Sequence, residues 1–288
     1  VSFFKEYFEY LNFFQYKSVM AIYDCFQYYN EETVLDLRLN ILNEHVNYFV
    51  VVESTTDHQG NNKRLNFNID NYKKFKNKII YVVVEDTKQN IKKPHTGQNS
   101  LVEQHQRNSI MRGLKKCSDN DLIIISDVDE IPDLKKLKYL DQKKRYAVFV
   151  QKKFDYKLNL LNTSEGDWHG SKICLKKNLI SPQWLRNLKF KHYPFWRFDK
   201  IRDIQIIKDA GWHFSYLQSP DEILKKISSF SHGERNQEKF KNIDRIEKKI
   251  KSQENIFDLG FSYKKVNIDD TYPKYIYDNL NKFKDWII

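Results

Sequence analysis

The chain has 288 residues, 40% of them hydrophobic, and carries 49 Lys and Arg against 38 Asp and Glu, a formal net charge of +11 at pH 7. It is long enough to bury a core without staples, and its three cysteines form no CxxC pair, which argues against a disulfide framework or a zinc site and favours a reducing compartment. Its basic residues are mostly dispersed lysines, so they predict a solvated surface, and no nucleic-acid-binding motif accompanies them.

Residues 1–19 are an aromatic-rich extension interrupted by charged residues such as Lys5, Glu6 and Lys17. This stretch lacks the basic start, apolar run and small-residue cleavage site of a signal peptide. Nowhere does the sequence reach the roughly 18–20 uninterrupted apolar residues that a membrane span needs. We expect a cytoplasmic protein, with residues 1–19 forming an amphipathic helix that packs on the domain or attaches it peripherally to a membrane.

From Met20 to about Asp133, short β-branched runs alternate with longer helical patterns. Near-continuous apolar runs predict buried strands, and apolar positions at helical spacing predict helices between them. The predicted strands are Tyr48–Val52, Ile79–Val84 and Leu122–Ser126, and the predicted helices are Thr33–Val46 and Leu101–Cys117. This rhythm is typical of an α/β fold with a mixed, mostly parallel sheet flanked by helices.

Beyond Pro132 the pattern loosens into extended segments and then becomes helical again. We expect strands at Tyr146–Leu161, Ile173–Lys176 and Ile204–Ile207, a helix starting at Pro220, and a charged helix at Glu234–Ile250. Internal repeats, low-complexity tracts and Pro-, Gly- or Ser-rich linkers are absent from the sequence. We therefore expect residues 20–288 to form a single domain.

An acidic cluster follows the strand predicted at Leu122–Ser126. Asp127 and Asp129 stand two residues apart, Glu130 follows, and Pro132 ends the element. Ligands of open α/β sheets bind outside the carboxyl ends of strands, and carboxylates are hard ligands for Mg²⁺ or Mn²⁺. The cluster therefore predicts a cation site that also holds substrate phosphates, whereas the plain structural interpretation is a turn in which the aspartates cap backbone amides.

Three further positions carry candidate functional side chains. Glu53 ends a predicted strand and Lys63 follows it, an arrangement that suits either a donor pocket or a surface loop. His213, between two aromatic residues, is either a structural histidine or a third ligand for the cation. Glu234 starts a predicted helix, where it either stabilises the helix dipole or acts in catalysis.

Several short segments in a shared order resemble one known family. They are Ile22–Phe26, Asn30-Glu31, Leu35, Leu37–Leu39, Leu42, Tyr48–Ser54, Gly60, Lys63, Gln106–Asn108, Ile124–Pro132, Gly211–Ser215 and Lys226–Ser229. In this order they resemble glycosyltransferase family 17, whose animal members add the bisecting N-acetylglucosamine to N-glycans. The resemblance covers most of residues 20–288.

The resemblance implies a GT-A fold and inverting transfer of a β-linked sugar from UDP-N-acetylglucosamine to a glycan acceptor. By position, Asp127 and Asp129 resemble the DxD pair that binds Mn²⁺ or Mg²⁺, and His213 a late metal ligand. Arg107 resembles a diphosphate contact, and Asp127, Glu53 and Lys63 resemble donor-pocket residues. Residues 155–200 match the family poorly, so the resemblance does not extend to the acceptor.

The resulting hypothesis is a metal-dependent transferase in which a cation neutralises the leaving diphosphate and a carboxylate deprotonates the acceptor hydroxyl. Glu234 and Glu130 are the candidate bases. Two other interpretations remain open at this point. One is a haloacid-dehalogenase-like phosphohydrolase with Asp127 as the nucleophile, and the other is a non-catalytic basic binding module.

Overall fold

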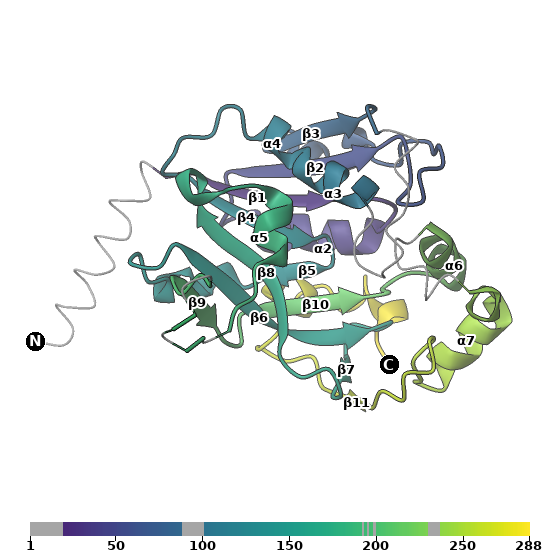
Figure 1. The fold of residues 1–288 in the computed structure, drawn as a ribbon. Helices are drawn as coiled ribbons and strands as arrows, with labels where there is room; N and C mark the ends of the chain where they lie inside the picture. The colour runs from purple at the N-terminus through teal and green to yellow at the C-terminus, as the bar shows by residue number, and fades with distance from the viewer. Residues whose placement is uncertain (1–19, 88–100, 192, 195, 198–199, 230–236) are drawn as a thin grey trace, which may run out of the picture.

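The computed structural model describes residues 20–87, 101–191, 193–194, 196–197, 200–229 and 237–288. Within this part of the chain, all the strands join one 11-stranded mixed sheet (Figure 1). Its first half is parallel, in the order β3-β2-β1-β4. These strands are β1 (Ile22–Gln27), β2 (Tyr48–Ser54), β3 (Ile79–Val84) and β4 (Leu122–Asp127).

The second half of the sheet continues from β4 through antiparallel β8 and β6. Two later strands, β9 and β10, add parallel to β6, and β5 pairs antiparallel with β10. The strands are β5 (Glu130–Pro132), β6 (Tyr146–Asp155), β7 (Leu160–Asn162), β8 (Trp168–Leu175), β9 (Ile204–Ile207), β10 (Gly211–Ser215) and β11 (Tyr263–Lys265).

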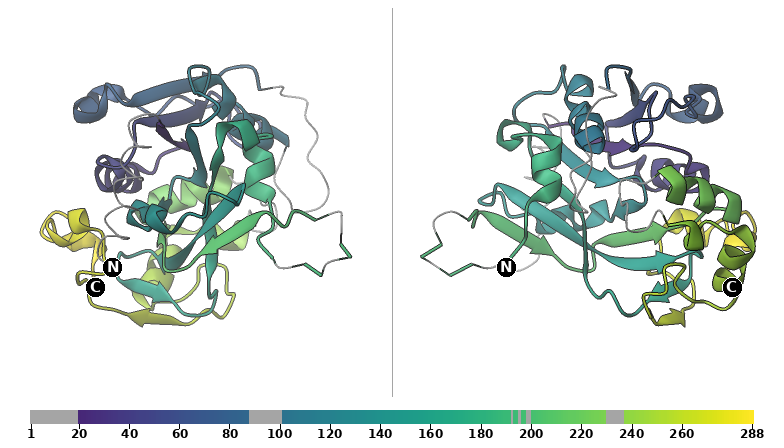
Figure 2. Two further views of the ribbon diagram at one scale, coloured as in Figure 1. Left: turned by 90° about the vertical axis from the view of Figure 1, so that its left-hand side faces the viewer. Right: turned by 45° about the vertical axis from the view of Figure 1, so that its right-hand side comes forward.

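Helices cover both faces of the sheet, as the views in Figure 2 make clear. On one face α2 (Glu32–Leu42) and the C-terminal segment pack with Phe49, Val51 and Ile124. On the other, α4 (Ile110–Gly113) and α5 (Pro182–Asn187) pack over Val50, Val52 and Ile123, and α3 (Leu101–Asn108) lies against β1 and β2. The remaining helices are α6 (Pro220–Ser229), α7 (Ile243–Lys251), α8 (Lys274–Tyr277) and the 3-10 helices η1 (Ile69–Phe75), η2 (Leu134–Tyr139), η3 (Lys176–Asn178), η4 (Glu238–Phe240) and η5 (Lys284–Trp286).

This architecture confirms the expected α/β class, with a large mixed sheet flanked by helices. The strands predicted at 48–52, 79–84, 122–126 and 204–207 are present at or within two residues of their expected ends. The strand expected at 173–176 starts earlier, at Trp168, and the helix expected at 33–46 ends at Leu42. No helix in the described ranges is both long enough and apolar enough to cross a membrane.

Three further predicted elements are wrong in their extent. The helix expected at 101–117 divides at Ser109, whose hydroxyl donates to the carbonyl of His105 at 3.0 Å. The strand expected at 146–161 divides at Tyr156, which has a φ of 66° and turns the chain into β7. Within the described residues, the helix expected at 234–250 begins at Ile243, because the side chain of Asn242 accepts from the amide of Arg245 at 2.9 Å.

Candidate functional site

The acidic cluster forms a tight turn between β4 and β5, at the carboxyl end of the parallel strands. Asp127 ends β4 and lies opposite Gln27, the last residue of the neighbouring parallel strand β1. The carbonyl of Asp129 accepts from the amide of Phe214 at 2.9 Å, and Glu130 pairs with His213 of β10. The turn therefore lies at the edge of the sheet where open α/β folds bind ligands.

Arg38 of α2 holds this turn from inside the molecule. It is fully buried and binds both carboxylate oxygens of Asp24, at 2.6 and 2.7 Å. The same guanidinium donates to the backbone carbonyls of Asp127, Val128 and Glu130, at 3.0, 3.1 and 2.8 Å. A buried charge is tolerated only when it is paired and hydrogen-bonded, so this arginine fixes the backbone of the turn.

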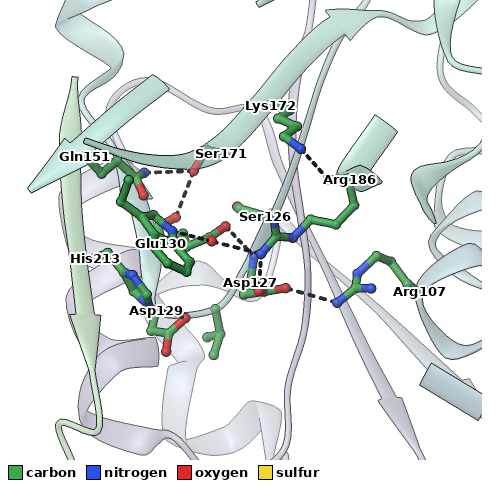
Figure 3. A network of polar contacts seen from close by, with 12 residues as sticks. Arg107, Ser126, Asp127, Asp129, Glu130, Gln151, Ser171, Lys172, Arg186 and His213 are labelled. Atoms are coloured by element: carbon green, nitrogen blue, oxygen red, sulfur yellow. Dashed lines mark hydrogen bonds and ion pairs between the residues drawn. The ribbon is translucent and has the colours of Figure 1, made fainter. Parts of the chain in front are cut away.

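Two arginines bind the carboxylate of Asp127, whose side chain is 37% exposed. Arg107 of α3 donates to its Oδ1 at 3.1 Å, and Arg186 of α5 donates to its Oδ2 at 2.7 Å (Figure 3). Desolvation works against ionisation of this carboxyl, but Arg186 and Arg107 together hold the pKa of Asp127 well below its ordinary value. Arg107 is itself positioned by Glu103 and Gln183, at 2.8 and 2.6 Å.

Glu130 is fully buried and has a hydrogen-bond donor at each carboxylate oxygen. Its Oε1 accepts from Trp168 Nε1 at 2.8 Å and from Arg186 at 3.1 Å, and its Oε2 accepts from the amide of Asp127 at 3.1 Å. Burial lowers the pKa of Arg186, but Asp127 and Glu130 outweigh this effect and raise it above its ordinary value. Arg186 therefore joins the two acidic side chains as a permanent cation.

Asp129 points to the other side of the turn, where it meets His213 and Lys226. Its Oδ1 is 3.6 Å from His213 Nε2, and its Oδ2 is 3.7 Å from Lys226 Nζ, which also contacts Glu31 at 3.1 Å. Burial by itself would raise the pKa of Asp129. His213, and then Lys226, have the opposite and larger effect and lower this pKa to about 2. His213 Nδ1 is buried and has no hydrogen-bond partner within the described residues.

The three residues expected to bind a metal do not form one donor set in the described part of the chain. No group of three His, Cys, Asp or Glu side chains lies there in an arrangement that could hold a cation. Both oxygens of Asp127 accept from guanidinium groups, while Asp129 and His213 form a separate pair. A carboxylate oxygen has two lone pairs, so the arginines alone do not exclude a cation at Asp127; what the described residues lack is a set of three ligands placed around one point.

Glu53 and Lys63 lie two strands away from Asp127, beyond β1, and bind each other. Lys63 Nζ contacts Glu53 Oε1 at 2.6 Å. The amides of Asn66 and Phe67 and the hydroxyl of Tyr81 also donate to the Glu53 carboxylate, at 2.7 to 3.0 Å. A carboxylate has about four lone-pair sites, and in Glu53 each of the two oxygens accepts two hydrogen bonds from the protein. Glu53 therefore organises its own loop and has no lone pair left for a ligand.

Two other expectations fall on residues outside the described ranges. Glu234, a candidate base, lies in the segment 230–236, and the extension at 1–19 precedes the first described residue. Their roles stay predictions.

Four side chains that the sequence did not single out as site residues complete the arrangement. They are Arg38, Trp168, Arg186 and Lys226. Arg38 carried one visible signal, because at helical spacing it falls between Leu35 and Leu42 on an otherwise apolar stripe. A charged residue at such a position must have a buried partner.

The profile described as glycosyltransferase family 17 matches residues 6–283. A search of curated proteins found no match. Among solved structures, a Bacillus anthracis protein described as a glucose-1-phosphate thymidylyltransferase, in complex with sucrose, is similar with 9% sequence identity and a TM-score of 0.34. The alignment covers 66% of this chain and 87% of that chain.

Proposed function

Because the chain belongs to glycosyltransferase family 17, we propose that it has a GT-A fold and transfers a sugar, with inversion, from a nucleotide-sugar donor to a hydroxyl of a glycan. The donor we propose is UDP-N-acetylglucosamine, which the family resemblance implies. The observation that carries the proposal is the position of Asp127, at the carboxyl edge of the parallel strands and between two arginines.

Arg107 and Arg186 are proposed to receive the donor diphosphate. Guanidinium groups bind phosphate oxygens in a bidentate manner, and a 37% exposed carboxylate holds both arginines at the sheet edge. When the bond between the sugar and the diphosphate breaks, negative charge accumulates on the leaving oxygen. Positive groups that are already in place stabilise this charge without reorganising, which lowers the barrier.

A divalent cation, Mn²⁺ or Mg²⁺, belongs to the proposal as a separate expectation carried by the DxD resemblance of Asp127 and Asp129. The geometry gives it less support than it gives the arginines, because the three expected ligands are divided between two ion-pair groups. Donor titrations with and without Mn²⁺ distinguish the two arrangements directly.

Glu234 is the base that we favour for the acceptor hydroxyl. The other candidate, Glu130, accepts from Trp168, Arg186 and the amide of Asp127, and these bonds take up three of the roughly four lone-pair sites of its carboxylate. A general base needs a lone pair directed at the hydroxyl whose proton it takes. Glu130 is therefore proposed to position Arg186 and Trp168.

The family assignment excludes the two other interpretations of the sequence as descriptions of this chain. A glycosyltransferase is neither a phosphohydrolase nor a non-catalytic basic module.

The proposal is tested by calorimetric titration of the protein with UDP-, GDP- and CMP-sugars, with Mn²⁺ and with a chelator. Arg186→Gln should weaken binding of the preferred donor by roughly 10- to 100-fold, the value of a charge-assisted hydrogen bond. Arg145→Gln is the matched control, since Arg145 is 57% exposed and pairs with Asp203 on the surface. Equal donor affinity in both variants would overturn the role of the arginines, and no binding of any nucleotide sugar would overturn the proposed function.

A further inference from the structure

One face of the sheet next to Asp129 is polar from β5 across to β6. Phe214 of β10 lies opposite Phe154 of β6, and both are buried in the core beneath the sheet. Side chains alternate along a strand, so His213, Lys153 and Asp155 lie on the opposite face. Because His213 contacts Asp129, this face begins at the proposed reaction centre.

Three buried polar atoms on or beside this face have no hydrogen-bond partner within the described residues. They are His213 Nδ1, Asp155 Oδ1 and Gln151 Oε1. Each belongs to a residue that is at most 6% exposed. Native proteins leave few such atoms unsatisfied, and a cluster of them on adjacent strands indicates a missing polar ligand or water.

An aromatic side chain borders these atoms and is held in a fixed position. Trp168 is half-buried, its Nε1 donates to Glu130 at 2.8 Å, and its ring lies 4.6 Å from the ring of His213. Lys153 Nζ lies 5.2 Å from the Trp168 ring centroid and forms an ion pair with Glu165. An immobilised aromatic surface beside unsatisfied polar atoms offers both kinds of contact that a pyranose makes, through its C–H face and through its hydroxyls.

The charges around this face favour an uncharged ligand. Lys153 contacts both Glu165 and Asp155, the latter at 3.7 Å, so its charge is compensated by two carboxylates. Asn162 Nδ2 donates to Asp155 Oδ2 at 2.9 Å, and Asp155 Oδ1, which accepts no hydrogen bond from the described residues, is the oxygen that lies 3.7 Å from Lys153 Nζ. Burial is the main cause that raises the pKa of Asp155. A sugar carboxylate bound here would be repelled by the carboxylates of Asp155 and Glu165.

We propose that the polar face from His213 to Asp155, with Trp168 as its aromatic wall, binds the acceptor as a neutral pyranose. Its hydroxyls would satisfy His213 Nδ1, Gln151 Oε1 and Asp155 Oδ1, and its ring would lie against Trp168. This inference rests on the proposed transferase function, because the contact between His213 and Asp129 is what connects the face to the donor.

The test is saturation-transfer NMR of the full chain with UDP, using methyl mannoside, methyl N-acetylglucosaminide, lactose and glucuronate as probes. The wild type should bind at least one neutral saccharide and not glucuronate. Asp155→Asn and Trp168→Leu should each weaken that binding at least tenfold. Glu165→Gln, which removes one compensating carboxylate from Lys153, should allow glucuronate to bind, whereas the control Glu247→Gln on exposed α7 should not.

Calorimetric titration with UDP keeps failure of this inference separate from failure of the proposed function. If UDP binds but no neutral saccharide does, or if neither Asp155→Asn nor Trp168→Leu alters saccharide binding, the acceptor site is overturned and enclosed water satisfies the three atoms. If neutral saccharides bind in the expected manner but neither UDP nor any nucleotide sugar does, the face is confirmed as a carbohydrate site and the transferase proposal fails.

Discussion

Replacing Arg38 with methionine should be among the most destabilising single substitutions in this protein. The change removes the partner of the fully buried Asp24 and the donor to three backbone carbonyls of the 127–130 turn. Removing one partner of a buried ion pair costs about 3–5 kcal/mol, and an unsatisfied buried polar group costs about 1–3 kcal/mol. We expect a loss of at least about 4 kcal/mol of unfolding free energy.

A double variant separates the two parts of this cost. In Arg38→Met/Asp24→Leu the unpaired carboxylate is gone, so most of the ion-pair contribution should be recovered, about 3 kcal/mol. The carbonyls of Asp127, Val128 and Glu130 still lack their donor. The double variant should therefore fold, yet use the nucleotide sugar less well than the wild type, because the turn that positions Asp127 is no longer held.

Urea denaturation followed by circular dichroism supplies the free energies, with the slope checking that the unfolded state is unchanged. Arg145→Met is the control, because its exposed pair with Asp203 should contribute at most about 1 kcal/mol. The reasoning would be refuted if Arg38→Met and Arg145→Met differed by less than about 1 kcal/mol, or if the double variant retained full donor binding.

Three further outcomes can be checked independently. Burial, and then Arg186, lower the pKa of Lys172 from its ordinary value of 10.5 to about 7. Between these two pH values Lys172 is therefore protonated in the unfolded chain and neutral in the folded chain. The unfolding free energy of the wild type, relative to Lys172→Met in urea titrations, should therefore rise with pH across that window, by on the order of 4 kcal/mol; a flat difference would contradict it. Glu234→Gln should lower kcat at least 100-fold with donor affinity unchanged, whereas Glu130→Gln should raise the dissociation constant of the donor; the reverse pattern in steady-state kinetics and calorimetry would exchange their roles. Gly113→Ala should cost about 1–3 kcal/mol in thermal or urea denaturation, because the new Cβ would lie 2.5 Å from Val50 Cγ1 in β2; a neutral substitution would show that α4 can move.

The parallel half of the sheet and the location of the site could be predicted from local patterns. The apolar run Leu122–Ser126 indicated a buried strand, and its carboxyl end indicated where Asp127 would emerge. The divided elements could not be predicted in this way. The break at Tyr156 depends on a left-handed residue, and the break at Ser109 depends on a hydroxyl that donates back to the helix.

The partners of the charged residues could not be predicted from the sequence either, because they are distant along the chain. Arg38 contacts a turn about 90 residues later, and Asp127 binds Arg186, 59 residues away. Arg186 lies in the region that matches the family poorly, so the resemblance offered no hint of it. Glu53 illustrates the opposite case, since a strand-end carboxylate looked available to a ligand until its four internal donors were visible.

The most direct test of the central claim is an NMR time course of UDP-N-acetylglucosamine incubated with the protein and a neutral saccharide acceptor. The account predicts release of UDP together with a new β-linked product, and loss of both in Arg186→Gln. Failure of the folded wild type to consume any UDP-, GDP- or CMP-sugar, or equal turnover in Arg186→Gln, would contradict it.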